Sequence, residues 1–455
     1  MTIEAVIAEV LRQIRPTEEE RTFVKRLMGE LKELAVETVE ELGLDVKPHF
    51  VGSLAKDTYL AGDHDVDLFL AFPLETPLQE LREKGLELGK VIARKLDSYE
   101  IAYAEHPYVR ASYKGVSVDI VPCYDVNSWR DVRTAVDRSI LHTRWVNENI
   151  KGKNDEVRLL KRFLKGINAY GSEIYVRGFS GYLAEILVIK YGSFLDVLKK
   201  ADFMLRQKII DPKNWLRREP EIAMRTVKRE VELDRPLIVL DPVDPRRNVA
   251  ANLSWERYGV FYFNAIKFLK EPSTKFFFPE KSRAGNYLDE LRRKGTHLVT
   301  LIFGKQDLVD DLLLPQLERS ARGFEKALER EGFRVFGWDY GYSGDKAFIM
   351  LEVDRAERPS VRIHPGPEFF TERGRDFYRK NERVWLRGKR LYAEKSVKEN
   401  ILDVISELLE KNQVSLGKNL REAVKDADFL VDYVPGDLEG EAYLFLSRKK
   451  EGLKG

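Results

Sequence analysis

The spacing of apolar residues along the first third of the chain alternates between helical and strand-like periods. Thr17-x-x-Glu20 is a capping-box pattern, and the apolar residues after it recur at helical spacing up to Leu42. Between 50 and 122, runs with a two-residue period flank one helical segment, 76–96. A two-residue period is typical of strands, because successive side chains point to opposite faces. We expect a mixed sheet here, with helices packed on it.

Two regions with other patterns follow. In 154–170 and 178–200, apolar residues recur every three or four positions, which predicts a central helical domain. Beyond residue 253, the order strand, helix, strand, strand predicts a small antiparallel sheet with helices on one face. These segments are 295–303, 312–331, 333–339 and 346–353. The segment 397–455 returns to helix and strand, and we expect it to rejoin that sheet.

Length and composition bound the class of protein. A chain of 455 residues is longer than one hydrophobic core supports. The patterns predict an α+β protein with domains at 1–144, 145–255 and 256–455. No run approaches the roughly 20 apolar residues that cross a bilayer, and the N-terminus lacks signal-peptide features, so we expect a cytoplasmic protein with no membrane partner. The single cysteine, Cys123, excludes an intramolecular disulfide and, with only six histidines, argues against a structural zinc cluster.

Basic and aromatic residues concentrate in one segment, 371–395. The net charge of the chain is only +2, so an RNA-binding surface must be a local patch. Nine Lys and Arg are interleaved here with four aromatic residues and four acids. An amphipathic helix with a solvated basic face would have the same composition. The candidate RNA-binding residues are Arg379, Lys380, Arg383, Arg387, Lys389 and Arg390.

Three aspartates carry the most specific chemistry. Asp65 and Asp67 are one residue apart, so they lie on the same face of a strand, and Asp119 lies in a second strand-like run that could be its neighbour. An isolated Asp-x-Asp is more often a solvated strand face or a turn. Three converging carboxylates, however, would hold Mg²⁺, which prefers oxygen ligands. Two such ions can activate an attacking hydroxyl and stabilise a leaving pyrophosphate.

A loop of small residues precedes this pair of acids. Gly52-Ser53 follows a strand-like run and precedes a helix start, where backbone N–H groups can bind phosphate. Lys56 lies within about one helical turn of Ser53 and could neutralise a triphosphate. A Gly-Ser pair by itself is more often a simple turn.

Taken together, these residues resemble a known family. Gly52-Ser53, Asp65-x-Asp67 and Asp119 are similar to the polymerase-beta-type nucleotidyltransferase superfamily. Most of the remaining chain resembles the archaeal-type, class I tRNA CCA-adding enzymes. The stretches that carry this closer resemblance are 137–145, 151–161, 176–182 and 241–251.

The resemblance implies a fold and an activity. The fold is a polymerase-beta-like catalytic head, a helical domain that covers the nucleotide, and a C-terminal tRNA-binding domain with an antiparallel sheet and helices. The activity is template-independent addition of C, C and A to tRNA from CTP and ATP, with Mg²⁺ held by Asp65, Asp67 and Asp119. Family members often carry Glu where this chain has Asp65. The family also suggests a homodimer.

The resemblance also assigns the nucleotide contacts. It implies that Arg247, rather than its neighbour Arg246, reads the base together with tRNA phosphates. Without the family, the other positions have plainer readings, such as a satisfied histidine, a helix-surface lysine and a core tyrosine. The implied nucleotide-binding residues are Ser53, Lys56, His142, Lys161, Tyr170 and Arg247.

Two alternatives remain open. A poly(A) or oligoadenylate polymerase would share the three acids and the helical domain, but would extend RNA with ATP alone. A catalytically silent RNA-binding protein would require loss of at least one acid, and all three are present. The stretches 137–161 and 241–251 favour CCA addition over the first alternative.

Overall fold

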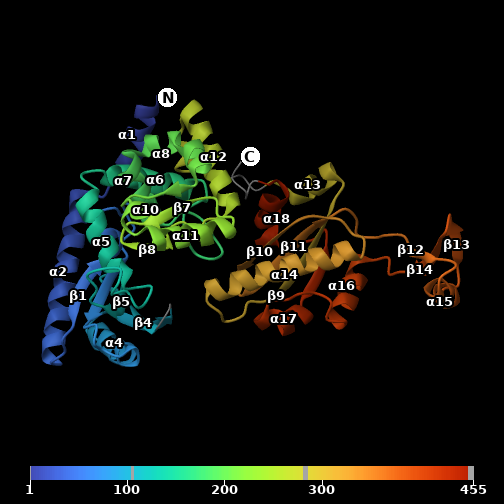
Figure 1. The fold of residues 1–455 in the computed structure, drawn as a ribbon, viewed down its shortest axis with the longest axis horizontal. Helices are drawn as coiled ribbons and strands as arrows, with labels where there is room; N and C mark the ends of the chain where they lie inside the picture. Colours follow the sequence, from blue (N-terminus) through green and yellow to red (C-terminus); the bar gives the residue numbers. More distant parts are fainter. Residues whose placement is uncertain (1, 104–106, 280–284, 449–455) are drawn as a thin grey trace. The chain divides into compact units, whose positions relative to one another are not determined.

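The computed structural model describes residues 2–103, 107–279 and 285–448 (Figure 1). These residues form two units, Met1–Lys281 and Ser282–Gly455. The three domain boundaries given above stay predictions. Within the described ranges, no helix is long and apolar enough to cross a membrane.

The first unit begins with the mixed sheet that the sequence predicts. The strand order is β1-β2-β5-β4-β3, and only β2 and β5 run parallel. The strands are β1 (Lys47–Val51), β2 (Val66–Phe72), β3 (Ser98–Tyr103), β4 (Pro107–Tyr113) and β5 (Val116–Tyr124). The helices around them are α2 (Glu18–Glu41), α3 (Gly52–Ala55), α4 (Leu78–Ala93) and α5 (Arg138–Asn149). Helix α2 begins with the expected capping box, in which Thr17 and Glu20 bond each other's backbone N–H.

The alternation of side chains along β2 separates the core from the site. Leu68 and Leu70 pack with α2 and α4 in one hydrophobic core, while Phe69 and Ala71 pack with Ile140 of α5 on the opposite face. Asp67 therefore belongs to the face that α2 and α4 leave uncovered.

The rest of the first unit is mainly helical, as the apolar spacing predicts. Its large core brings together α1, α6, α7, α8 and α12 around Phe163 and Phe194. The helices are α1 (Ile3–Ile14), α6 (Asn154–Gly166), α7 (Gly181–Tyr191), α8 (Phe194–Lys199), α9 (Ala201–Gln207), α10 (Trp215–Arg218), α11 (Pro220–Glu232), α12 (Trp255–Lys270) and the short η1 (Thr274–Phe276). A small sheet of order β6-β7-β8 adds β6 (Ile209–Ile210), β7 (Ile238–Asp241) and β8 (Asp244–Asn248).

The second unit contains the antiparallel sheet, with order β10-β11-β9-β15. Its strands are β9 (His297–Gly304), β10 (Val335–Ser343), β11 (Lys346–Val353) and β15 (Asp428–Val431). The pairing of β15 with β9 confirms that the C-terminal segment rejoins this sheet.

The expectation of helices on one face of that sheet is wrong, because both faces are covered. Ile349 and Leu351 pack against α14, α16 and α17, whereas Phe348 and Met350 pack against α13 and α18. These helices are α13 (Tyr287–Lys294), α14 (Asp310–Arg330), α16 (Ile401–Glu410), α17 (Arg421–Lys425) and α18 (Glu439–Leu446), with short turns η2 (Lys418–Leu420) and η3 (Gly436–Leu438). The continuous apolar run of β11 is the reason, since it has two faces to bury.

The basic segment does not form a single amphipathic helix. It contributes α15 (Glu372–Lys380), β13 (Val384–Arg387) and β14 (Arg390–Ser396), and β14 also pairs with β12 (Val361–Glu368). The result is a separate three-stranded sheet of order β12-β14-β13 with one helix.

Candidate active site

The central carboxylates lie side by side in the sheet of the first unit. Asp67 of β2 is the direct partner of Asp119 in the parallel register of β2 and β5. Asp65 precedes the first residue of β2 and so lies just outside this ladder. The sequence prediction of acids on two neighbouring strands is therefore confirmed for Asp67 and Asp119.

Gly52 brings the small-residue loop against this pair. Its φ is +75°, a conformation that side chains rarely adopt, and a Cβ added here would lie 1.8 Å from Oδ2 of Asp67. Only glycine leaves room for the carboxylate. Ser53, the candidate phosphate contact, is the next residue, in the single turn of α3.

Burial and two nearby carboxylates make the ionised form of Asp67 unfavourable. Burial, the neighbouring Asp119 and then Asp65 raise its pKa to about 6, against the opposing charge of Lys56. A divalent cation would relieve this repulsion, and carboxylate oxygens are the ligands that such cations prefer. The donor set therefore fits a divalent cation.

Asp119, however, is bound by an arginine. Arg110 of β4 donates from Nε to Oδ1 at 2.8 Å and from Nη2 to Oδ2 at 3.1 Å. In the described part of the chain, no three His, Cys, Asp or Glu side chains are grouped as a metal site. Each oxygen keeps a second lone pair, so a cation bound at Asp119 would share the carboxylate with this guanidinium, whose positive charge would oppose it.

The two candidate nucleotide-binding lysines, Lys56 and Lys161, share one buried carboxylate. Lys56 Nζ lies 2.7 Å from Oε2 of Glu185, on α7, and Lys161 Nζ lies 3.4 Å from Oε1. Thr58 donates to Oε1 at 2.6 Å and accepts from Lys161. Burial acts to raise the pKa of Glu185, but the charges of the two lysines hold it below its usual value. The cluster has one acid for two ammonium groups, which suits an anionic ligand.

Lys161 and Tyr170 are neighbours in this cluster. The side chain of Lys161 is only 5% exposed, so a helix-surface charge is excluded, and burial lowers its pKa to about 8. A Cβ on Gly181 would lie 2.9 Å from the Tyr170 hydroxyl and 3.5 Å from Cε of Lys161. Glycine at the start of α7 thus lets both groups approach the helix backbone closely.

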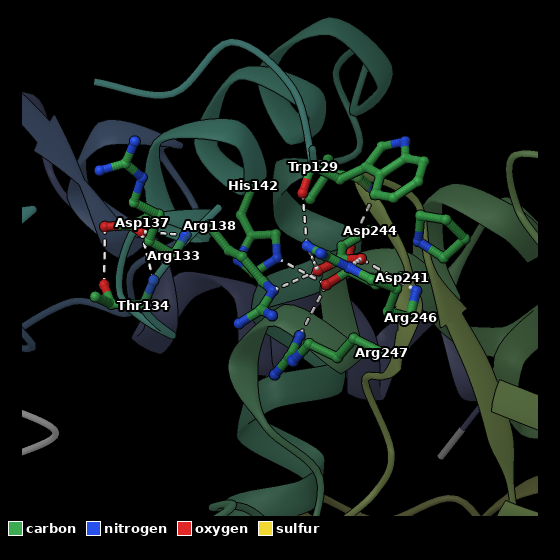
Figure 2. A network of polar contacts seen from close by, with 12 residues as sticks. Trp129, Arg133, Thr134, Asp137, Arg138, His142, Asp241, Asp244, Arg246 and Arg247 are labelled. Carbon is green, nitrogen blue, oxygen red and sulfur yellow. Dashed lines mark hydrogen bonds and ion pairs between the residues drawn. The ribbon is translucent and has the colours of Figure 1, made fainter. Parts of the chain in front are cut away.

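A second network holds His142 and Arg247 on one carboxylate (Figure 2). Oδ2 of Asp241 lies 2.8 Å from Nε2 of His142 and 2.9 Å from Nη1 of Arg247. Oδ1 accepts from the Tyr182 hydroxyl at 3.1 Å, and the Tyr182 ring contacts the His142 ring at a tilt of 30°, with centroids 3.9 Å apart. Burial opposes ionisation of Asp241, but His142 and Arg247 hold its pKa well below the usual value.

Arg246, the neighbour of Arg247, is committed to other partners. Its Nε and Nη2 bond the two oxygens of Asp244 at 2.8 and 3.1 Å, and Nη2 also donates to the carbonyl of Trp129. Asp244 further accepts from Arg138 at 2.8 Å (Figure 2). Among the described residues Arg247 donates one hydrogen bond, to Asp241, so of the two arginines it has more donors available for a ligand.

Comparison with known proteins shows the family to which this chain belongs. Family models described as "Nucleotidyltransferase domain", "tRNA nucleotidyltransferase, second domain" and "CCA-adding enzyme, C-terminal domain" match residues 32–142, 155–278 and 294–431. The chain is 75% identical to the CCA-adding enzyme of Thermococcus gammatolerans and 76% identical to that of Thermococcus kodakarensis, over 100% of all three chains. It is 38% identical to that of Archaeoglobus fulgidus, over 94% of both.

The chain belongs to the family of CCA-adding enzymes. CCA-adding enzymes are nucleotidyltransferases, and a divalent metal ion is their general cofactor. The matched nucleotidyltransferase segment contains all three aspartates, and the matched second-domain segment contains Lys161, Glu185 and Asp241.

The basic residues of the candidate RNA surface lie in the segment matched to the C-terminal domain of CCA-adding enzymes. Arg387 and Arg390 are partners in the β13–β14 ladder. Beside them, α15 and β13 form a groove of about 490 Å³ lined by residues such as Tyr378, Arg379 and Trp385. Arg379 lines this groove, and the Arg387 guanidinium lies over the Tyr392 ring, 5.5 Å from its centroid. The groove and the surrounding candidate residues of 379–390 form the basic groove of the second unit.

The sequence interpretation missed three charged partners: Arg110, Glu185 and Asp241. Arg110 had a local signal, because a two-residue hairpin at Lys114-Gly115 places it opposite Asp119. Glu185 had none for its contact with Lys56, 129 residues away, and Asp241 had none for its contact with His142, 99 residues away. Arg247 is only six residues from Asp241, across the turn between β7 and β8.

Proposed function

We propose that this chain adds C, C and A in turn to the 3′ end of tRNA, with CTP and ATP as substrates and pyrophosphate as product. The observation that carries the proposal is the register of Asp67 and Asp119 beside Gly52, next to the two buried lysines around Glu185. In a metal-bound triphosphate, the carboxylates can bind the metal ions and the lysines can bind the phosphate groups.

In this proposal Asp65, Asp67 and Asp119 hold Mg²⁺. The bound ions would lower the pKa of the RNA 3′-hydroxyl and stabilise the leaving pyrophosphate. Asp119 would share its carboxylate between the cation and Arg110 in this role.

The nucleotide is held by the protein's own side chains. Ser53, Lys56 and Lys161 contact the triphosphate, and Tyr170 and His142 line the rest of the nucleotide. Arg247 reads the base. Lys56 and Lys161 are already held in place by Glu185, so they lose little side-chain freedom when the phosphates bind.

The tRNA would be bound in part through the basic groove of the second unit. Arg379, Lys380, Arg383, Arg387, Lys389 and Arg390 are the proposed phosphate contacts. Such contacts supply affinity without reading sequence. We further propose a homodimer acting in the cytoplasm, and sedimentation of the purified protein would test the dimer.

One assay tests the activity. Purified protein is incubated with Mg²⁺, single nucleotides or pairs, and a tRNA transcript that ends at the discriminator base. CTP and ATP together should give a product three nucleotides longer that is not extended further. A long ladder with ATP alone would instead favour a poly(A)-type polymerase, and no extension would favour a silent RNA-binding protein.

A further inference from the structure

Asp241 is a fully buried carboxylate that joins several functional groups. It is the last residue of β7, and its side chain has no exposed surface. Beyond His142, Arg247 and Tyr182, its Oδ1 accepts from the backbone N–H of Val243 at 3.0 Å, and its carbonyl accepts from the Trp215 indole at 2.8 Å. Both the backbone and the carboxylate of Asp241 are therefore held in fixed positions.

This fixed carboxylate determines where the guanidinium of Arg247 points. A guanidinium has five N–H donors in one rigid plane. One Nη1 bond to Asp241 orients that plane, and it is the hydrogen bond that Arg247 donates within the described part of the chain. With 37% of its side chain exposed, Arg247 keeps donors on the side facing away from Asp241.

The chemistry of the bases makes this orientation important. Cytosine and adenine each present a ring-nitrogen acceptor beside an amino group, whereas uracil and guanine present a ring N–H beside a carbonyl. A donor fixed opposite the ring nitrogen can form a hydrogen bond with C and A. In U and G the same donor faces an N–H group, with which it cannot form a hydrogen bond. A guanidinium that could rotate would instead reach the carbonyl oxygens of U and G. Selectivity therefore depends on the donor being held still.

We propose that Asp241 is a positioning residue that sets nucleotide selectivity by fixing the guanidinium of Arg247. The inference rests on the proposed role of Arg247 as the base reader. Asp241 does not contact the base, and it acts through the shared carboxylate seen in Figure 2.

Asp244 provides a matched control. It is equally buried, it is also bonded to two basic side chains, and it is three residues away in the sequence. Its basic partners are Arg138 and Arg246, and within the described residues it accepts no hydrogen bond from Arg247. Asp244→Asn should therefore disturb the fold about as much as Asp241→Asn, without releasing the base reader.

The test measures kcat/KM for CTP and UTP on a tRNA transcript ending at the discriminator base, and for ATP and GTP on one ending in CC. The ratio for each pair does not depend on the fraction of folded enzyme, so a merely structural role leaves it unchanged. Asp241→Asn should lower both ratios by about tenfold or more, and Asp244→Asn should leave them within about threefold. If Asp241→Asn lacks measurable activity, Asp241→Glu, which displaces the carboxylate by one methylene, takes its place with the same expected loss.

A double variant separates this inference from the proposed function. Adding Asp241→Asn to Arg247→Ala should lower the ratios no further, because the group that Asp241 positions is gone. Unchanged ratios in the Asp241 variant, or an equal loss with and without Arg247, would overturn the role of Asp241 alone. Unchanged ratios in Arg247→Ala would overturn the base reader and, with it, this inference.

Discussion

Arg110 and Asp119 lie directly opposite each other on β4 and β5, and the guanidinium donates to both oxygens of the carboxylate. Asp119 raises the pKa of Arg110 by hydrogen bonding, so the cation stays charged at any pH at which the protein is folded. The charge of the guanidinium therefore competes with that of a divalent cation at the same carboxylate.

Replacing Arg110 should strengthen cation binding. Arg110→Gln frees Asp119, so the Mg²⁺ concentration that gives half-maximal activity should fall several-fold. Titration calorimetry with Mg²⁺ in the absence of tRNA measures the same effect directly. Arg144→Gln, an exposed arginine of α5, is the control. An unchanged or weaker Mg²⁺ affinity for Arg110→Gln would contradict the competition.

The register of Asp67 and Asp119 predicts a separation of catalysis from binding. Asp67→Ala and Asp119→Ala each remove one of the two paired carboxylates. Nucleotide incorporation should therefore fall at least about a hundredfold, while tRNA affinity stays within about threefold of the unmutated protein. Single-turnover incorporation and a filter-binding assay measure the two quantities. Substantial activity in either variant would exclude that residue as a metal ligand.

Glu185 should be important for stability as well as function. Glu185→Gln leaves Lys56 and Lys161 buried near each other without a carboxylate, and breaking such a pair costs about 3–5 kcal/mol. Denaturant unfolding measures the loss. Glu80→Gln, which breaks an exposed pair with Lys84, should change stability by less than about 0.5 kcal/mol. Near-identical stability of the two variants would show that the buried lysines need no counter-charge.

Local patterns were sufficient for much of the fold but not for the site's partners. The capping box at Thr17 and the alternation around Asp67 depend on neighbouring residues, so the sequence reveals them. The second face of the β11 sheet was missed because a continuous apolar run was interpreted as an ordinary strand. The contacts of Glu185 with Lys56 and of Asp241 with His142 could not be predicted, because only tertiary packing brings these residues together.

Burial of Lys161 predicts a pH-dependent stability. Its pKa falls from 10.5 to about 8 because burial outweighs the attraction of Glu185. Between about pH 8 and 10.5 the unfolded chain therefore binds more protons than the folded one, and the free energy of unfolding rises with pH. Lys161→Met removes this contribution. Its stability relative to the natural chain should fall by on the order of 3 kcal/mol across the window. A difference that does not change with pH would contradict the lowered pKa.

The basic groove of the second unit should bind tRNA through phosphates. Arg387 and Arg390 are neighbours in the β13–β14 ladder, so a double Arg387→Ala and Arg390→Ala variant removes two adjacent charges. tRNA affinity should then fall, and the slope of log affinity against log salt should decrease by about one per lost contact. Arg292→Ala with Arg293→Ala, exposed on α13, is the matched control. Because phosphate contacts do not read bases, the preference for CTP and ATP should stay unchanged. An unaltered salt slope would place the tRNA contacts elsewhere.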